Sequence, residues 1–456
     1  MMKINFILLF MFIFLFMNKK IMFFYNIIYL LSFFFLFKFM FKDSLIWIDL
    51  SLYFGLDFYS YYMLVLSLWV MGLVFMVIQF EESSEDKYIY IKKLLLFLIM
   101  LMILIIFFSS LNLLLFYLMF ELSLIPMFII IIYWGMNFER LVAAYYLLMY
   151  TIFISLPLFI YLIKLLKFNG SFDFNLMMIM KINMSSGDNK VGLGLGDYLI
   201  LFLAFYIKLP IYIFHVWLPK AHVESPVYGS MILAAILLKL GGFGLLRFMK
   251  MFIMVSVKFN YMIFSVSIIG SLLLSLVCLI QIDMKKLVAY SSVVHMNILL
   301  CSLLTMMKLG AVSAYILMIS HGLCSSGLFF MVNLYYERSL SRLMFFNKGM
   351  MNLFSLLSFW WFILCVANFS FPFSMNFFSE IFMIMVIISW DIILMIFMMM
   401  ICFFSSAYSL YLYSYIQQGF LYYENKFYMI NLKDFMVLFI HVSPLILFIV
   451  NLSLFY

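Results

Sequence analysis

The run LLLFLIMLMILIIFF at residues 94–108 sets the strictest limit on what this chain can fold into. Similar runs recur along all 456 residues, of which 69% are hydrophobic and 10% charged. A soluble protein is roughly half apolar and a quarter charged. A helix needs about 20 apolar residues to cross a bilayer, and it satisfies its own backbone hydrogen bonds there. The sequence therefore predicts an all-α protein with many membrane-spanning helices.

Hydropathy, turn residues and charges predict about fourteen spans. Their limits are 4–17, 21–42, 56–80, 93–110, 112–133, 141–167, 197–218, 227–248, 260–281, 287–307, 312–336, 350–389, 391–416 and 434–455. The twelfth is too long for one crossing and is divided by Pro372. The first resembles a signal peptide, but no alanine occurs before Ala143 to form a cleavage site, so we expect it to remain as a helix.

The charges and cysteines point to a membrane rather than to nucleic acid or metal. The net charge of +8 is spread over short loops and single helix positions, so it does not predict a nucleic-acid partner. A small majority of the loop cations fall in odd-numbered loops, which places those loops inside and both termini outside. The five cysteines lack metal or redox spacing. The usage of 59 Phe, 42 Met and 31 Tyr is typical of AT-rich coding, as in an organellar genome.

Six ionisable residues lie near the middle of predicted spans. They are Glu121, Lys208, Lys239, His295, His321 and Glu380. A charge at the bilayer centre costs about 2.5–3.5 kcal/mol on insertion scales. One such histidine can be a packing residue, and one Lys–Glu pair can simply hold two helices together. Six groups on six spans favour an ion or proton path instead, since chains of these residue types are the usual membrane relays.

Two prolines add to this interpretation. Pro210 follows Lys208 by two residues, and Pro372 precedes Glu380 by eight. Proline removes a backbone donor and opens the helix, and the freed groups then require protein or water as partners. Burial disfavours the charged form of a lysine and a nearby carboxylate favours it, so a carboxylate that moves can switch a proton on or off. Interrupted helices in corresponding places of two halves indicate an inverted-repeat transporter.

Five segments carry a resemblance to a known family. They are KLPIYIFHVWLPKAHVESPVYGSMILAAILLKLGGFGLLR (208–247), FYLMFELSLIPMFIIIIYWGMNFER (116–140), QIDMKKLVAYSSVVHMN (281–297), MISHGLCSSGLFFMVNLYYER (318–338) and AYSLYLY (407–413). Together they resemble the antiporter-like membrane subunits of respiratory complex I, and chain 4 more than chains 2 and 5. The first hundred residues resemble the family in hydropathy alone.

The resemblance implies fourteen helices with two inverted five-helix repeats. Helices 1–3 would occupy residues 1–92, the first repeat 93–248, the second repeat 260–416, and a loop with helix 14 residues 417–456. The broken helices would be the seventh, at Pro210, and the twelfth, at Pro372.

The resemblance also implies roles for the six ionisable residues. Glu121 matches the glutamate of the fifth helix, and Lys208 matches the lysine with which it pairs. Lys239 matches the central lysine of the eighth helix, His295 and His321 the connecting histidines, and Glu380 the distal acid. The implied path runs from Lys239 past His295 and His321 to Glu380. His215 and His222 would have accessory positions. Ser379 stands where many relatives have glycine.

The function implied is proton translocation in the membrane arm of complex I, in the inner mitochondrial membrane. Electrons would pass from NADH to ubiquinone in other subunits, which hold the FMN and iron–sulfur clusters; this chain shows no motif for these cofactors. Its partners would be chains 2 and 5, accessory subunits and lipids that include cardiolipin. Two alternatives stay open on these residues: a cation/proton antiporter that acts alone, and a subunit that only holds its neighbours together.

Overall fold

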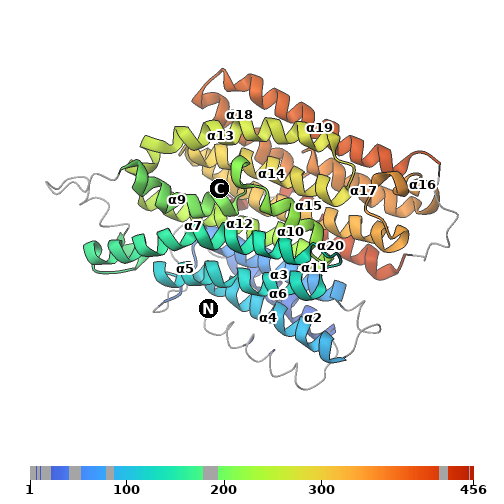
Figure 1. Ribbon diagram of the computed structural model, residues 1–456, viewed down its shortest axis with the longest axis horizontal. Coiled ribbons are helices and arrows are strands. Elements are labelled where there is room, and N and C mark those ends of the chain that lie inside the picture. The colour runs from blue at the N-terminus through green and yellow to red at the C-terminus, as the bar shows by residue number, and fades with distance from the viewer. Residues whose placement is uncertain are drawn as a thin grey trace. The chain divides into compact units, whose positions relative to one another are not determined.

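The computed structural model describes residues 7, 11, 22–40, 53–78, 87–177, 194–420, 430–450 and 452–455. Within these residues the regular elements are helices (Figure 1), and three isolated β-bridges lie outside them. Ten helices in the described ranges are long and apolar enough to cross a membrane, or eleven if one bent pair forms a single span. The protein is therefore a multi-pass helical membrane protein.

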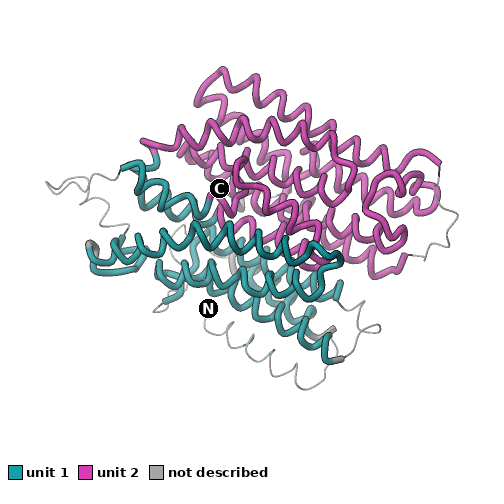
Figure 2. Tube along the Cα trace, viewed as in Figure 1, with its two compact units in different colours: residues 1–205, 243–256 teal, residues 206–242, 257–456 magenta. Residues whose placement is uncertain are grey.

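Two compact units divide the chain, and Figure 2 colours them separately. Unit 1 comprises Met1–Phe205 and Phe243–Ser256, and unit 2 comprises Tyr206–Gly242 and Val257–Tyr456. The helices of the first stretch are α2 (Met22–Met40), α3 (Phe58–Ile78), α4 (Lys87–Ser109), α5 (Leu113–Leu122), α6 (Leu124–Trp134), α7 (Arg140–Asn169) and α9 (Leu195–Lys208).

The remaining helices belong mainly to unit 2. They are η2 (Tyr212–Phe214), α10 (Trp217–Glu224), α11 (Val227–Ile232), η3 (Leu233–Leu237), α12 (Leu238–Met251), α13 (Ile253–Ile280), α14 (Met284–Leu304), α15 (Lys308–Ser339), η4 (Met344–Asn347), α16 (Met350–Leu353), α17 (Ser355–Asn368), α18 (Met375–Trp390), α19 (Leu394–Gln417), α20 (Leu432–Val450) and η5 (Leu452–Phe455). Helices α9, α12 and α13 each pass from one unit into the other.

Unit 1 is held together by aromatic packing and one buried ion pair. Phe116 of α5 stacks on Phe107 of α4 with ring centroids 4.4 Å apart, and Phe205 packs on Phe248 at 4.7 Å. The Arg247 guanidinium lies 3.0 Å from the Asp57 carboxylate and is 7% exposed. Aromatic side chains bury large apolar areas, so these contacts make α4, α5, α9 and the second half of α12 one core.

Helix α15 forms the centre of unit 2. It packs against α11, α14, α17, α18 and α20, and its apolar stretch is wholly buried. Close packing requires small residues on its surface. A Cβ atom on Gly327 would lie 3.0 Å from the Leu364 side chain of α17, so glycine lets the two helices approach. Polar groups on α15 are thereby placed inside the protein rather than at its lipid face.

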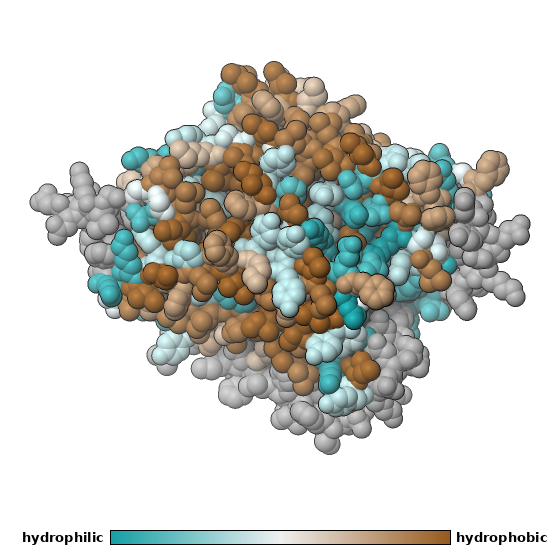
Figure 3. Space-filling model, in the orientation of Figure 1, coloured by the Kyte–Doolittle hydropathy of each residue, from teal (hydrophilic) through white to brown (hydrophobic). Residues whose placement is uncertain are grey.

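The outer faces of unit 2 are apolar. Ile396, Met399 and Phe403 of α19 are each more than half exposed. Brown, hydrophobic side chains cover the upper part of Figure 3, where Figure 1 labels α13, α18 and α19. Exposed apolar patches of this size do not occur on soluble monomers, so these faces suit contact with lipid or with other membrane helices.

Most of the predicted spans agree with observed helices to within a few residues, because hydropathy is a local property. Two do not. The span predicted at 197–218 is interrupted, since α9 ends at Lys208. The span predicted at 350–389 comprises α17 and α18 separately, and the short helices before α17 meet it at 119°. Of the first predicted span, 4–17, only residues 7 and 11 are among those described.

Candidate functional site

The chain leaves helical geometry beside Lys208. Helix α9 ends at this residue, and a 3₁₀ turn begins at Tyr212, so Pro210 lies between the two. Proline cannot supply the next backbone N–H. The indole N–H of Trp217 donates to the carbonyl of Ile207 at 3.2 Å, which satisfies one acceptor that the interruption exposes. Lys208 itself is only 3% exposed.

Lys239 lies directly after a π-helical turn. Elements α11, η3 and α12 run without interruption, and η3 covers Leu233–Leu237. The Lys239 ammonium donates to the carbonyl of Ala234, five residues earlier, at 2.5 Å. It also lies 3.0 Å from Nδ1 of His321 on α15. The π-turn is common at functional sites, and here it frees a carbonyl that orients a fully buried lysine toward a histidine.

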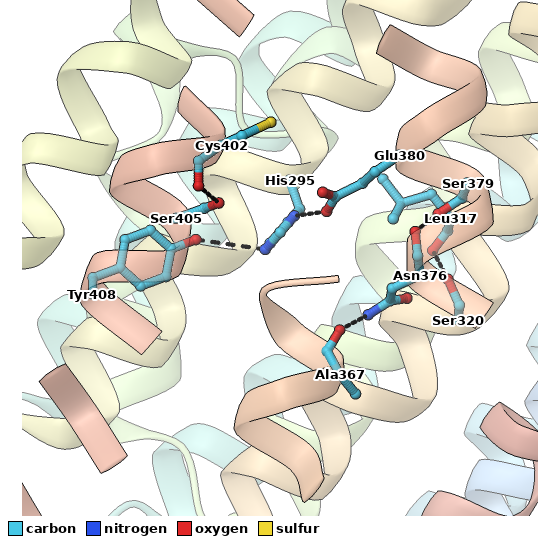
Figure 4. Close-up of polar contacts among 10 residues, drawn as sticks. All are labelled: His295, Leu317, Ser320, Ala367, Asn376, Ser379, Glu380, Cys402, Ser405 and Tyr408. Carbon is cyan, nitrogen blue, oxygen red and sulfur yellow. Dashed lines mark hydrogen bonds and ion pairs between the residues drawn. The ribbon is translucent and has the colours of Figure 1, made fainter. Parts of the chain in front are cut away.

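Two histidines and a glutamate continue from Lys239. The rings of His321 and His295 have centroids 5.4 Å apart. His295 of α14 places Nδ1 3.2 Å from the Glu380 carboxylate of α18, and its Nε2 lies 3.5 Å from the Tyr408 hydroxyl of α19 (Figure 4). Both histidines are at most 2% exposed. The contacts follow the order Lys239, His321, His295, Glu380, in which the two histidines stand the other way round from the predicted path; the path itself stays a prediction.

The second interruption lies just before Glu380. Helix α17 ends at Asn368 and α18 begins at Met375, with Pro372 in the exposed loop between them. The Asn376 amide donates to the carbonyl of Ala367 at 2.7 Å across this loop (Figure 4). One side chain therefore fixes the end of α17 against the start of α18, and Glu380 follows one turn later on the same helix.

The two accessory histidines have different surroundings. His215 is half-buried, and its Nδ1 lies 3.0 Å from the carbonyl of Tyr212, on which its ring stacks. His222 is fully buried and stacks on Phe329 of α15 at 4.6 Å. Neither ring nitrogen of His222 has a hydrogen-bond partner in the described part of the chain. His222 lies within electrostatic range of Lys239 and His321, although no hydrogen bond joins it to the row in the described part of the chain.

Glu121 belongs to unit 1, whereas Lys208 belongs to unit 2. Glu121 is half-buried near the end of α5, two residues before the junction with α6 at Ser123. Because the two residues belong to different units, their pairing stays a prediction.

Sequence reasoning missed three polar residues of unit 2. Tyr408 lies in the AYSLYLY motif, but its contact with His295 depends on α19 packing beside α14. Lys285 was assigned to a loop, yet it is buried in α14 and donates to the carbonyl of Ser225 at 3.3 Å. Arg342 donates to the carbonyl of Val223 at 2.7 Å. The two cations together hold the last carbonyls of α10.

The row of buried side chains is suited to moving protons. A neutral imidazole accepts at one nitrogen and donates at the other, and histidine changes charge near neutral pH. Lysine can likewise be neutral when buried, whereas arginine cannot. Among the described residues no group of three or more His, Cys, Asp or Glu could hold a metal ion. The arrangement provides proton donors and acceptors on four different helices.

Two family descriptions match the chain. Residues 110–406 match "NADH:quinone oxidoreductase/Mrp antiporter, TM", and residues 1–106 match "NADH-ubiquinone oxidoreductase chain 4, amino terminus". The first covers complex I subunits and antiporters alike, whereas the second is specific to chain 4. It also extends the match to the N-terminal region, where sequence motifs alone were uninformative.

Individual relatives agree. NADH-ubiquinone oxidoreductase chain 4 of Aedes aegypti is 46% identical over 88% of this chain and 88% of its own length, and that of Ceratitis capitata is 42% identical over 89% and 88%. A chain in respiratory complex I from Thermus thermophilus with bound NADH has the same fold, with a TM-score of 0.81 at 20% identity over 92% of this chain and 89% of that one. The chain therefore belongs to the NADH-ubiquinone oxidoreductase chain 4 family.

Proposed function

We propose that this chain is a proton-translocating subunit in the membrane arm of respiratory complex I. The observation that carries the proposal is the buried row Lys239–His321–His295–Glu380, which joins α12, α15, α14 and α18 within one unit. A row of four titratable side chains in a membrane interior is costly unless its groups exchange protons or compensate one another. Family membership links it to NADH oxidation, which takes place in other subunits of the complex.

In this proposal the chain supplies the proton path, and the redox groups belong to other subunits. A proton on Lys239 passes to Nδ1 of His321, and the other ring nitrogen of His321 hands a proton toward His295. Protonated His295 is stabilised by the Glu380 carboxylate at 3.2 Å. Lys208, with Glu121 as its partner, sets when Lys239 receives its proton. Moving one charge against 100 mV costs about 2.3 kcal/mol, which electron transfer elsewhere in the complex supplies through a conformational change.

The finer architecture follows the family. The fourteen helices would form an N-terminal group in residues 1–92, inverted repeats in 93–248 and 260–416, and a final helix in 417–456. The interruptions at Pro210 and Pro372 would then occupy equivalent positions in the two repeats. The location would be the inner mitochondrial membrane, with chains 2 and 5 as neighbours and cardiolipin among the bound lipids.

The test neutralises the pair that we propose to control the row. Complex I assembled with Lys208→Met or Glu121→Gln is reconstituted in vesicles, and NADH oxidation and proton uptake are measured together. We expect fewer protons per NADH. Lys164→Met and Glu139→Gln are matched controls, because Lys164 is 50% exposed and Glu139 is exposed at the start of α7. A normal proton-to-electron ratio in both test variants would refute the assigned roles.

The antiporter alternative is retained only because the first family description includes antiporters. It predicts that the isolated chain exchanges cations for protons in vesicles without any electron transfer. The full-length similarity to chain 4 proteins favours the complex I subunit. If the isolated chain exchanged cations for protons as fast as the intact complex moves protons, the antiporter would be preferred instead.

A further inference from the structure

A line of buried polar residues follows one face of α13. Asn260, Ser267, Ser271 and Ser275 are spaced by seven, four and four residues, which keeps them on the same face of a helix. Each is at most 1% exposed. The intervening residues Met262, Ile269, Leu273 and Leu276 are exposed, so α13 turns its polar line inward and its apolar side outward. Nothing in the proposed row of titratable groups uses these residues.

Two contacts show that the polar line faces α14. The amide of Asn260 donates to the carbonyl of Leu304 at 2.9 Å, and the Ser267 hydroxyl lies 3.0 Å from the Cys301 sulfur. The two helices are therefore antiparallel, so higher residue numbers on α13 lie beside lower residue numbers on α14. From this register we infer that Ser271, one turn after Ser267, lies at the level of Asn297, one turn before Cys301.

Asn297 lies on the face of α14 that carries Cys301, the residue that contacts Ser267 of this line. It precedes Cys301 by four residues, so it lies on the same face of α14. It is completely buried, and among the described residues neither its amide nitrogen nor its amide oxygen has a hydrogen-bond partner. The facing serines donate to their own helix, Ser271 to Ile268 at 2.7 Å and Ser275 to Leu272 at 2.6 Å. Their oxygens keep lone pairs that can accept a hydrogen bond.

A buried amide needs partners, and water is the partner that this geometry admits. Nearly all buried polar groups are bonded to protein or to ordered water, and a buried water requires two to four polar neighbours. If Asn297 only joined two helices, its amide would bond α13 directly, as Asn260 bonds α14. The Asn297 amide, the Ser271 and Ser267 hydroxyls and the Cys301 thiol offer the required neighbours.

We propose that Asn297 holds water between α13 and α14, and that this water forms a path for protons toward the C-terminal end of α14. The path rests on the proposed function, and the predicted topology places that end outside. It begins at the level of His295, two residues before Asn297, and continues past Ser267 and Asn260. Each water accepts a proton from one neighbour and passes a different proton to the next. Asn297 positions the water and does not itself carry a proton. Glu380 then acts as the counter-charge of His295.

The first experiment tests the water directly. The whole complex is imaged at a resolution that shows ordered water, with the native chain and with Asn297→Leu. We expect a water within hydrogen-bonding distance of the Asn297 amide in the native chain and a dry contact in the variant. A dry native contact overturns the proposal. This result does not depend on whether the chain pumps protons, so it separates the water site from the proposed function.

The second experiment tests conduction. Protons per NADH are measured for Asn297→Leu, which removes the polar group at similar volume, and for Asn297→Ser, which keeps a donor and an acceptor. We expect the number of protons per NADH in Asn297→Leu to fall to that of a Glu380→Gln variant. In Asn297→Ser it should stay near the native value. If Asn297→Leu does not assemble, Ser271→Val and Ser271→Thr provide the same contrast. A native ratio in the apolar variant, with a lowered ratio in Glu380→Gln, overturns this path while the proposed function stands.

Discussion

Glu380→Gln is the sharpest single perturbation of the buried row. It keeps the shape of the side chain and its ability to bond His295, but it removes the negative charge. His295 and Glu380 are separated by 3.2 Å, and two unit charges at that distance attract by about 5 kcal/mol at an effective dielectric constant of about 20. The variant loses this attraction whenever His295 carries a proton.

This loss should appear as a coupling defect rather than as an assembly defect. An isolated buried charge destabilises a protein strongly. The variant replaces the buried pair by two neutral groups, so it leaves no such charge behind. We expect a complex of normal subunit composition that oxidises NADH but takes up fewer protons per NADH. The assay is simultaneous measurement of NADH absorbance and of vesicle acidification, with an uncoupler to give the unlimited electron-transfer rate.

Glu337→Gln is the matched control, because Glu337 lies near the end of α15 and bonds Asn333 instead of a histidine. It undergoes the same chemical change outside the row. A normal proton-to-electron ratio in Glu380→Gln, together with normal assembly, would show that protonated His295 is not an intermediate. The row would then be a set of packing contacts.

Two further predictions concern pumping and stability. Lys239→Met removes a buried charge that costs about 2.5–3.5 kcal/mol to insert, so we expect full assembly with a lowered proton-to-electron ratio; poor assembly with normal coupling would contradict this. Gly310→Ala would place a Cβ atom 2.5 Å from the Ser302 carbonyl and 2.9 Å from the Thr305 hydroxyl. Such crowding costs about 1–3 kcal/mol, so thermal inactivation of the complex should begin at a lower temperature, whereas Gly194→Ala, with open space around it, should not change it.

The sequence predicted the apolar spans well and the polar contacts only in part. Span limits follow from local hydropathy, so α3, α14 and α15 could be located without knowledge of their neighbours. The titratable residues could be found because charges are rare in such segments. Their contacts could not, because Tyr408 reaches His295 from 113 residues away. Lys285 was placed in a loop for the same reason: its burial depends on a carbonyl of Ser225, 60 residues earlier.

The end of α9 at Lys208 has one more consequence. The peptide dipoles of a helix add up to a partial negative charge of about half an elementary charge at its C-terminus, which stabilises a nearby cation by about 0.3–1 kcal/mol at exposed sites and more when buried. By ending the helix at the lysine, the proline at position 210 gives the ammonium a fixed electrostatic partner made of backbone. Unlike a carboxylate, that partner can be neither protonated nor moved away, so it sets a constant background for the proposed pairing of Lys208 with Glu121.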